Sequence, residues 1–213
     1  KDVGPSTDPD EDSGAGDGDG ESVVWENLAH DTSREFTDAY FDGSTLYVTA
    51  RATSGDAGET WKWEDGEWIS IPYDSTNNLN ALWGNGSAPS LSMVAVGEDG
   101  MLADWNGTQW VTTADSTTNF LGVDGPNPNQ LMAVGGGGIW DNMSGGWARQ
   151  QVDSDDHLND IWFDGTTAVA VGNDGTIATY LDGEWSFEQH SSGAHLYGVS
   201  GKNNQDVWAV GSE

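Results

Sequence analysis

Residues 158–189, LNDIWFDGTTAVAVGNDGTIATYLDGEWSFEQ, contain one complete copy of the pattern that decides the fold. Four short runs of β-branched, aromatic and small apolar residues alternate with turn sequences that end in Asp-Gly or begin with it. Such runs are typical of β-strands, and Asp-Gly favours the positive φ angles of tight hairpin turns. The pattern therefore predicts antiparallel strands at 158–163, 168–171, 176–181 and 184–189.

Two landmarks of this unit recur along the chain about every 40 residues. The first is the Trp of a Gly-x-Trp-like turn, found at Trp25, Trp68, Trp110, Trp147 and Trp185. The second is the apolar residue that opens the next unit, found at Phe36, Leu79, Phe120, Leu158 and Leu196. No segment has a sustained helical period. A four-stranded unit repeated at this interval predicts an all-β chain in which residues 22–213 form a β-propeller of four-stranded antiparallel blades.

The number of blades depends on how the two ends of the repeat meet. Trp25 lies in the phase of a fourth strand and precedes the first unit, whereas 196–201 and 206–211 supply a first and a second strand. The third strand of that composite blade has no counterpart in the sequence. We expect five blades, with the Trp25 strand closing the ring. The alternative is that the chain forms part of a propeller of seven or eight blades.

The charge of the chain is extreme. Thirty-six acidic residues face six basic ones, giving a net charge of −30. Self-repulsion of this size is tolerable where concentrated salt shortens the screening length to about 3 Å at 1 M, which predicts a halophilic source. Nucleic acid is not an expected partner, because the sequence offers no basic stripe to meet phosphates. The absence of cysteine excludes disulfides and thiolate metal sites, and no apolar run approaches a membrane span.

The first 21 residues are acidic and almost without apolar side chains, so we expect a disordered spacer at 1–21. Four aspartates fall at positions 1, 3, 5 and 12 of a calcium-loop-like register: Asp8, Asp10, Asp12 and Asp19. Position 6 is Ser13 rather than the glycine of such loops, and a solvated tether is therefore preferred over a calcium site. No other cofactor is expected.

Three further asparagines fit the N-glycosylation pattern: Asn85, Asn106 and Asn142. Together with a chain that opens on Lys1 rather than Met, they lead us to expect an extracellular or cell-surface protein from which an N-terminal segment is removed, with lipid anchoring as one route. The sequence leaves the oligomeric state open.

The unit resembles the Asp-box (bacterial neuraminidase) repeat, and is similar to the propellers of photosystem II assembly factors. The matching pieces are Leu158–Trp162, Gly175–Ile177, Gly183–Trp185 and Asp206–Gly211. One stretch fits the complete box, with Ser54, Asp56, Gly58, Thr60 and Trp61. The resemblance implies a propeller, and it implies that the box is a structural turn clasp in which Asp accepts backbone N–H groups. In phase, the box lies at the turn before a third strand, one hairpin earlier than the family places it.

The residues favour a binding protein over an enzyme. If the resemblance extended to sialidase activity, it would imply three arginines around a substrate carboxylate, but Arg34, Arg51 and Arg149 fall at unequal phases of the repeat. The histidines share repeat positions at loop ends, which is not the pattern of a metal cluster. We therefore rank an interaction scaffold with a protein partner first, a glycan-binding lectin second and a glycoside hydrolase third.

Overall fold

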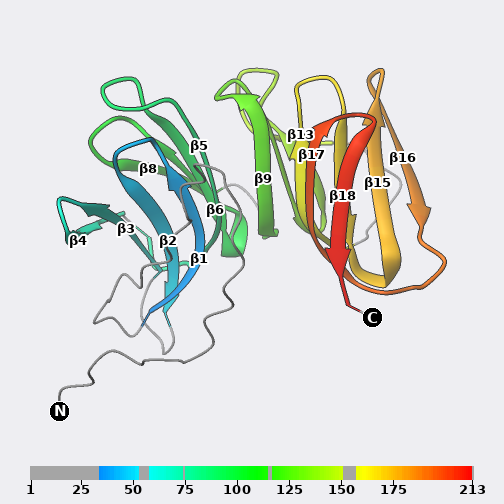
Figure 1. The fold of residues 1–213 in the computed structure, drawn as a ribbon, viewed down its shortest axis with the longest axis horizontal. Helices are drawn as coiled ribbons and strands as arrows, with labels where there is room; N and C mark the ends of the chain where they lie inside the picture. Colours follow the sequence, from blue (N-terminus) through cyan, green and yellow to red (C-terminus); the bar gives the residue numbers. More distant parts are fainter. Residues whose placement is uncertain (1–33, 53–57, 74, 115–116, 151–156, 213) are drawn as a thin grey trace, which may run out of the picture. The chain divides into compact units, whose positions relative to one another are not determined.

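The computed structural model describes residues 34–52, 58–73, 75–114, 117–150 and 157–212, all within one compact unit, residues 32–213 (Figure 1). Its strands are β1 (Arg34–Phe41), β2 (Leu46–Ala52), β3 (Glu59–Glu64), β4 (Glu67–Ile71), β5 (Leu79–Asn85), β6 (Ser92–Gly97), β7 (Met101–Trp105), β8 (Trp110–Ala114), β9 (Asn119–Asn127), β10 (Gln130–Gly136), β11 (Gly138–Asp141), β12 (Ala148–Arg149), β13 (Leu158–Phe163), β14 (Ala168–Gly172), β15 (Thr176–Leu181), β16 (Glu184–Gln189), β17 (Leu196–Asn203) and β18 (Asp206–Gly211). Two single 3₁₀ turns, η1 (Glu98–Gly100) and η2 (Asn173–Gly175), are the only helical elements in these ranges. No described segment forms a helix that could cross a membrane.

The strands form five antiparallel sheets in chain order. We name them sheet I (β1–β4), sheet II (β5–β8), sheet III (β9–β12), sheet IV (β13–β16) and sheet V (β17–β18). Within each sheet every strand pairs with the next strand along the chain. The first strand of each sheet contacts the first strand of the following sheet. The prediction of an all-β fold built from four-stranded antiparallel units, as in propeller blades, is confirmed. A closed ring of five blades stays a prediction, because Trp25 lies outside the described residues.

The tight turns form where the sequence places Asp-Gly. Asp182 and Gly183 both have positive φ, 53° and 90°, and connect β15 to β16 as a two-residue loop. Asp65 and Gly66 do the same between β3 and β4. Two consecutive residues of positive φ give the turn whose twist matches the flanking strands, and glycine and aspartate adopt it at low cost.

A second kind of turn joins the first and second strands through a carboxylate. The Oδ1 atom of Asp164 accepts hydrogen bonds from the backbone N–H groups of Thr166 and Thr167 and from the Thr166 hydroxyl, all at 2.8 Å. Asp42 holds the equivalent turn of sheet I in the same way. These are Asx turns, in which a short side chain replaces a backbone acceptor.

Every first strand carries a β-bulge at the residue that follows the apolar landmark of its unit. In sheet IV, Leu158 pairs with Gly172 and Asp160 with Val171, so that Asn159 is left over. The same shift occurs in the other four sheets. A bulge redirects the extra side chain, and here it turns that side chain toward the following sheet.

The second strands of sheets II to V share an Ala-Val-Gly motif, and its glycine lies opposite this bulge. A Cβ on Gly172 would overlap the carbonyl oxygen of His157, and Gly97, Gly135 and Gly211 meet the equivalent carbonyl. Only a residue without a side chain allows the two backbones to approach this closely. Sheet I has Ala50 at this place, and there the pairing of β1 with β2 continues as far as Arg34 and Ala52.

The hydrophobic core is divided into three clusters, one between each pair of successive sheets from sheet I to sheet IV. Within a second strand the side chains alternate: Val134 packs toward sheet IV, and its neighbour Ala133 packs toward sheet II. We call the side of a sheet turned toward the following sheet its forward face, and the other side its backward face. The tryptophans that mark the repeat divide between full burial, as for Trp110, and half-burial, as for Trp185.

Candidate functional site

Polar side chains of the first strands join each sheet to the next. The bulge residues donate to the carbonyl that opens the following sheet: the Thr37 hydroxyl to Leu79 at 3.0 Å, Asn80 Nδ2 to Phe120 at 2.7 Å, and Asn159 Nδ2 to Leu196 at 2.7 Å. Leu121 stands at this position in sheet III and has no such group. This contact occurs at three junctions between successive sheets. Single side chains therefore help to fix the position of one sheet on the next.

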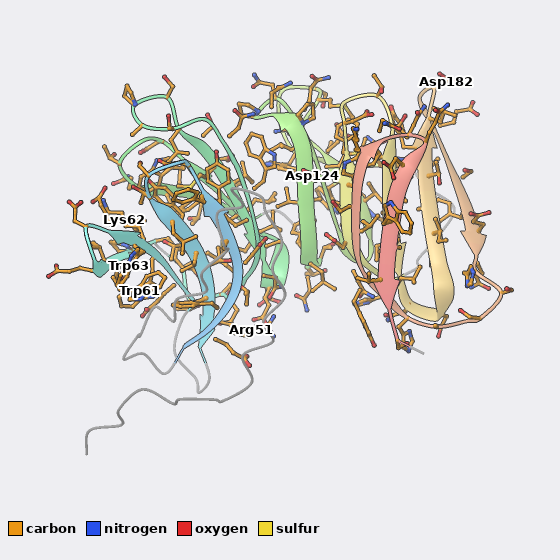
Figure 2. The ribbon with its side chains drawn as sticks, viewed as in Figure 1. Arg51, Trp61, Lys62, Trp63, Asp124 and Asp182 are labelled. Carbon is orange, nitrogen blue, oxygen red and sulfur yellow. The ribbon has the colours of Figure 1, made fainter. Side chains whose placement is uncertain are left out.

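Three aspartates reinforce the same junctions. Asp38 and Asp160 accept the backbone N–H groups of Leu82 and Val199 in the following sheet, at 2.8 and 2.9 Å. Asp124, on β9 in Figure 2, accepts the N–H of Phe163 at 2.8 Å. Each of these half-buried carboxylates accepts a hydrogen bond from the backbone of the following sheet.

The pKa values of these carboxyls are shifted upward. Burial raises the pKa of Asp38, Asp124 and Asp160 above the ordinary aspartate value, against the lowering effect of the N–H groups that they accept. For Asp160 the negative charges of Asp38 and Asp124 raise the pKa further. The raised values follow from this structural placement and do not by themselves indicate catalysis.

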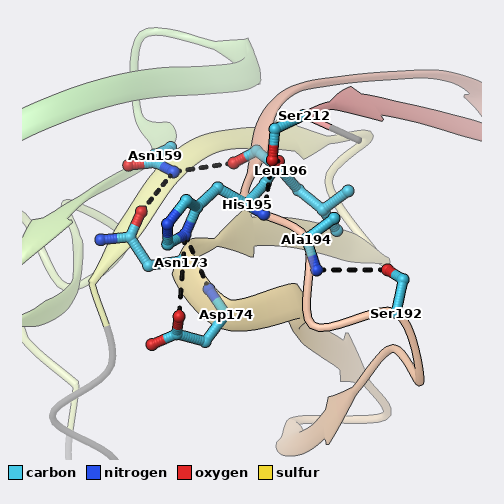
Figure 3. Close-up of polar contacts among 8 residues, drawn as sticks. All are labelled: Asn159, Asn173, Asp174, Ser192, Ala194, His195, Leu196 and Ser212. Carbon is cyan, nitrogen blue, oxygen red and sulfur yellow. Dashed lines mark hydrogen bonds and ion pairs between the residues drawn. The ribbon is translucent and has the colours of Figure 1, made fainter.

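The loop-end histidine His195 belongs to the same junction system. Its Nδ1 atom accepts the backbone N–H of Asp174 in η2 at 3.0 Å and lies 3.8 Å from the Asp174 carboxylate (Figure 3). Asn119 accepts the N–H of Asp99 in η1 in the equivalent place. Among the described residues, no group of three or more histidine or acidic side chains is placed to hold a metal ion.

A groove opens between sheets I and II, near their outer strands. Its volume is about 430 Å³. Most of the residues that line the groove are apolar: Tyr47, Ile69, Ile71, Pro72, Pro89, Leu91 and Trp105, together with Ala88 and Gly107. The polar lining residues are Lys62, Glu64, Ser70 and Thr108. Its volume lies within the range of small-molecule sites.

The polar groups of the groove centre on one ion pair. Lys62 Nζ lies 2.6 Å from Glu64 Oε2 on β3. Figure 2 shows Lys62 beside Trp61 and Trp63, with which it alternates along the strand. The other carboxylate oxygen of Glu64, Oε1, lies 3.5 Å from the Thr45 hydroxyl. This groove was not predicted from the sequence. Two features of the sequence could have indicated it. One is a lysine in the middle of a strand of a very acidic chain, and the other is a loop between β5 and β6 that is longer than the Asx turns at this place in other sheets.

The forward face of sheet V differs from all the others. Val210 is 68% exposed, whereas Val96, Val134 and Val171 at the same repeat position are 0% exposed. Trp208, two residues earlier, is 74% exposed. Tyr197, at the bulge position of β17, is 58% exposed. Sheet V therefore presents three large apolar side chains where every preceding sheet is covered by its successor.

The Asp box lies partly within the described residues. Gly58 immediately precedes β3, as Gly100 precedes β7 and Gly175 precedes β15, so the box occupies the phase read from the sequence. Ser54 and Asp56 lie outside the described residues. The Thr60 hydroxyl donates to the Ile71 carbonyl at 2.6 Å and accepts Trp110 Nε1 at 2.8 Å, which ties sheet I to sheet II. Trp61 is half-buried on the backward face.

The three candidate glycosylation asparagines occupy different surroundings. Asn142 Nδ2 donates to the Pro128 carbonyl at 2.8 Å, and Asn85 Nδ2 donates to the Pro126 carbonyl at 3.2 Å. Asn106 is exposed in a turn and uses its Oδ1 to accept the N–H groups of Thr108 and Gln109. The amide nitrogen is the atom that a glycan joins, so Asn106 fits the modification best. The candidate calcium aspartates Asp8, Asp10, Asp12 and Asp19 lie outside the described residues.

The arginines have separate partners. Arg51 donates to Asn80 Oδ1 at 2.9 Å, and Arg149 donates to the Gly137 carbonyl at 3.0 Å. Arg34 opens β1. Arg51 thus contacts sheet II, while Arg149 contacts its own sheet.

Neither the protein-family models nor the curated proteins contain a match to this chain. Among solved structures it is similar to the computationally designed Ika8 protein, with a TM-score of 0.59 and 16% identity over 81% of this chain and 54% of that one. The chain thus spans about half the length of that designed protein. At this identity, the likeness shows the fold alone.

Proposed function

We propose that this chain is a non-enzymatic binding scaffold that assembles in concentrated salt, outside the cell or on its surface. The observation that carries the proposal is the forward face of sheet V, where Val210 is exposed at a position that sheets II to IV bury fully, and Trp208 at one that they bury fully or in part. Soluble monomers rarely expose clustered large apolar side chains, and such patches mark interaction sites. The acidic surface supports the high-salt setting, because salt screens the repulsion between like-charged copies.

The occupant that we propose for this face is a second copy of the chain, in place of the ring closure by the Trp25 strand that the sequence led us to expect. Each forward face from sheet I to sheet III is covered by the backward face of the next sheet, so a backward face is the surface that this repeat is shaped to bind. Sheet I carries such a face, with half-buried Trp61, Trp63 and Trp68. The Trp63 and Trp68 rings pack edge to face, 5.3 Å between centroids.

A contact of this kind is head to tail. The forward face of sheet V in one copy would meet the backward face of sheet I in another, and the two surfaces differ. Such heterologous contacts give rings where the rotation closes and open filaments where it does not. More than one assembly size is therefore expected as the protein concentration rises.

Light scattering and sedimentation in concentrated salt test the proposal. The unchanged chain should associate in a concentration-dependent manner, and the double substitution Trp208→Ser with Val210→Ser should weaken association by roughly tenfold or more, because two large apolar side chains lose their burial. Val111→Ser is the matched control, since Val111 is 46% exposed on β8, away from this face. A chain that stays monomeric at every concentration would refute the proposal.

A further inference from the structure

The groove between sheets I and II is a gap in an otherwise regular interface. Between sheets III and IV, Tyr180, Trp185 and Phe187 pack onto the core cluster from the outer strands. Between sheets I and II, Trp105 and Trp110 occupy the positions of Tyr180 and Trp185 in the strand register. The facing strands of sheet I, however, present a charged pair and the 40% exposed Ile69. These side chains leave the two sheets apart at their outer edges.

The lining of the groove is amphipathic. Tyr47, Ile71 and Leu91 belong to or pack against the core cluster between the two sheets and give an apolar base. Lys62, Glu64 and Thr108 supply a strong donor, a strong acceptor and a hydroxyl. An apolar pocket with a few placed polar groups selects a ligand that has both an apolar face and a hydrogen-bonding edge.

The charges in and around the groove further restrict the class of ligand that it can bind. The ammonium of Lys62 is compensated by Glu64 at 2.6 Å, so the groove offers no free cation to an anionic ligand. The surrounding protein has a net charge of −30, which repels anions. A cationic ligand would have to compete with Lys62 for the Glu64 carboxylate. A neutral ligand with several hydroxyl groups meets neither obstacle.

We propose that this groove binds a neutral pyranose sugar. The C–H face of the ring would lie against the indole of Trp105, and hydroxyl groups at its edge would donate to Glu64 and accept from Lys62 and Thr108. The proposal is independent of assembly through sheet V, because that face and the groove share no residue.

The test is a titration of the whole chain with glucose, galactose and mannose, and with neutral disaccharides of each, in concentrated salt. Binding is followed through the indole resonance of Trp105, assigned by its loss in Trp105→Phe. At least one of these sugars should saturate that resonance, and Glu64→Gln combined with Lys62→Met should weaken its binding tenfold or more. Trp208→Ser is the control and should leave sugar binding unchanged.

Three outcomes would overturn the proposal: no saturable shift of the Trp105 resonance with any neutral sugar, tighter binding of glucuronate or glucosamine than of the neutral parent sugar, or binding that persists unchanged in the double variant. The last would place the sugar elsewhere. Both charged residues are partly exposed, with side chains 26% and 41% accessible, so their substitution should not unfold the sheet.

Discussion

Individual aspartates play opposite electrostatic roles in this chain. Asp42 and Asp164, at the Asx turns, have pKa values below the ordinary one: burial acts to raise them, but the N–H and hydroxyl donors at each turn outweigh it. Asp38, Asp124 and Asp160, between the sheets, have raised pKa values because burial dominates. The same residue type is therefore an anion held by donors in one place and a costly buried charge in another.

The Asx turns lead to a prediction about Asp164. Asp164→Ala removes the acceptor of three hydrogen bonds and should lower the free energy of unfolding by about 1–2 kcal/mol. Asp164→Asn should cost much less, because Asn106 already holds an equivalent turn through its Oδ1. Denaturant unfolding in concentrated salt distinguishes the two. Equal losses in both variants would show that the side-chain oxygen is not what holds the turn.

The glycine opposite the bulge supports a second prediction. Gly172→Ala would force a methyl group onto the His157 carbonyl oxygen, and should destabilise the chain by roughly 3 kcal/mol. Gly43→Ala is the control, since a Cβ there meets nothing within 4 Å and only its positive φ of 98° opposes the change. Thermal unfolding of both variants measures the difference. A loss at Gly172 no larger than at Gly43 would contradict the close approach.

The inter-sheet carboxyls predict a pH dependence. A folded-state pKa above the unfolded value means that the ionised form opposes folding, and this penalty is removed as the pH falls through the folded pKa toward the unfolded one. Asp160→Asn should therefore gain stability relative to the unchanged chain as the pH rises from the acidic range to neutrality. Unfolding at a series of pH values in concentrated salt gives the difference. If the difference in unfolding free energy between Asp160→Asn and the unchanged chain does not change with pH, a raised pKa at Asp160 is excluded.

Among the elements, β17 and β18 are the least protected by packing. Their sheet has two strands, whereas each of the other four has four strands in the described residues. Amide exchange should consequently be faster in β18 than in β14, its counterpart in sheet IV, when the protein is dilute. Exchange in β18 should slow as the concentration rises and copies associate, while β14 should not change. Hydrogen exchange read by mass spectrometry measures both.

Much of this element structure was predictable from the sequence. The four strands expected at 158–189 match β13 to β16 within a residue, because each of the first three runs ends at an Asp-Gly or Gly-Asn-Asp-Gly turn that a strand cannot pass. The polar contacts between successive sheets were not predictable from the sequence. Asn159, Asp160 and His195 look like ordinary polar residues in one dimension, and the bulge that directs Asn159 to Leu196 depends on the backbone of the neighbouring strand.

The two surfaces that we propose as binding sites could not be predicted from the sequence either. The exposure of Val210 cannot be predicted from a motif whose other copies are buried, because it depends on how the sheets of the described residues pack on one another. The groove depends on Lys62 and Glu64 standing where another interface has apolar packing. Sequence repeats predict what neighbouring units share, whereas the two proposed binding surfaces lie where the units differ.

In its described residues the chain is a series of sheets joined by first-strand hydrogen bonds, with a core cluster between each pair of successive sheets from sheet I to sheet IV. Its net charge of −30 opposes compaction and association at low ionic strength. Both the free energy of unfolding and the extent of self-association should therefore increase with salt concentration.

A structure determined in concentrated salt would show whether copies of the chain meet through sheet V. We predict that Trp208 and Val210 of one copy are buried against the backward face of sheet I of another, with the junctions of sheets I to V as described. A structure in which both side chains remain in solvent, or are covered by residues 22–33 of their own chain, would contradict the account.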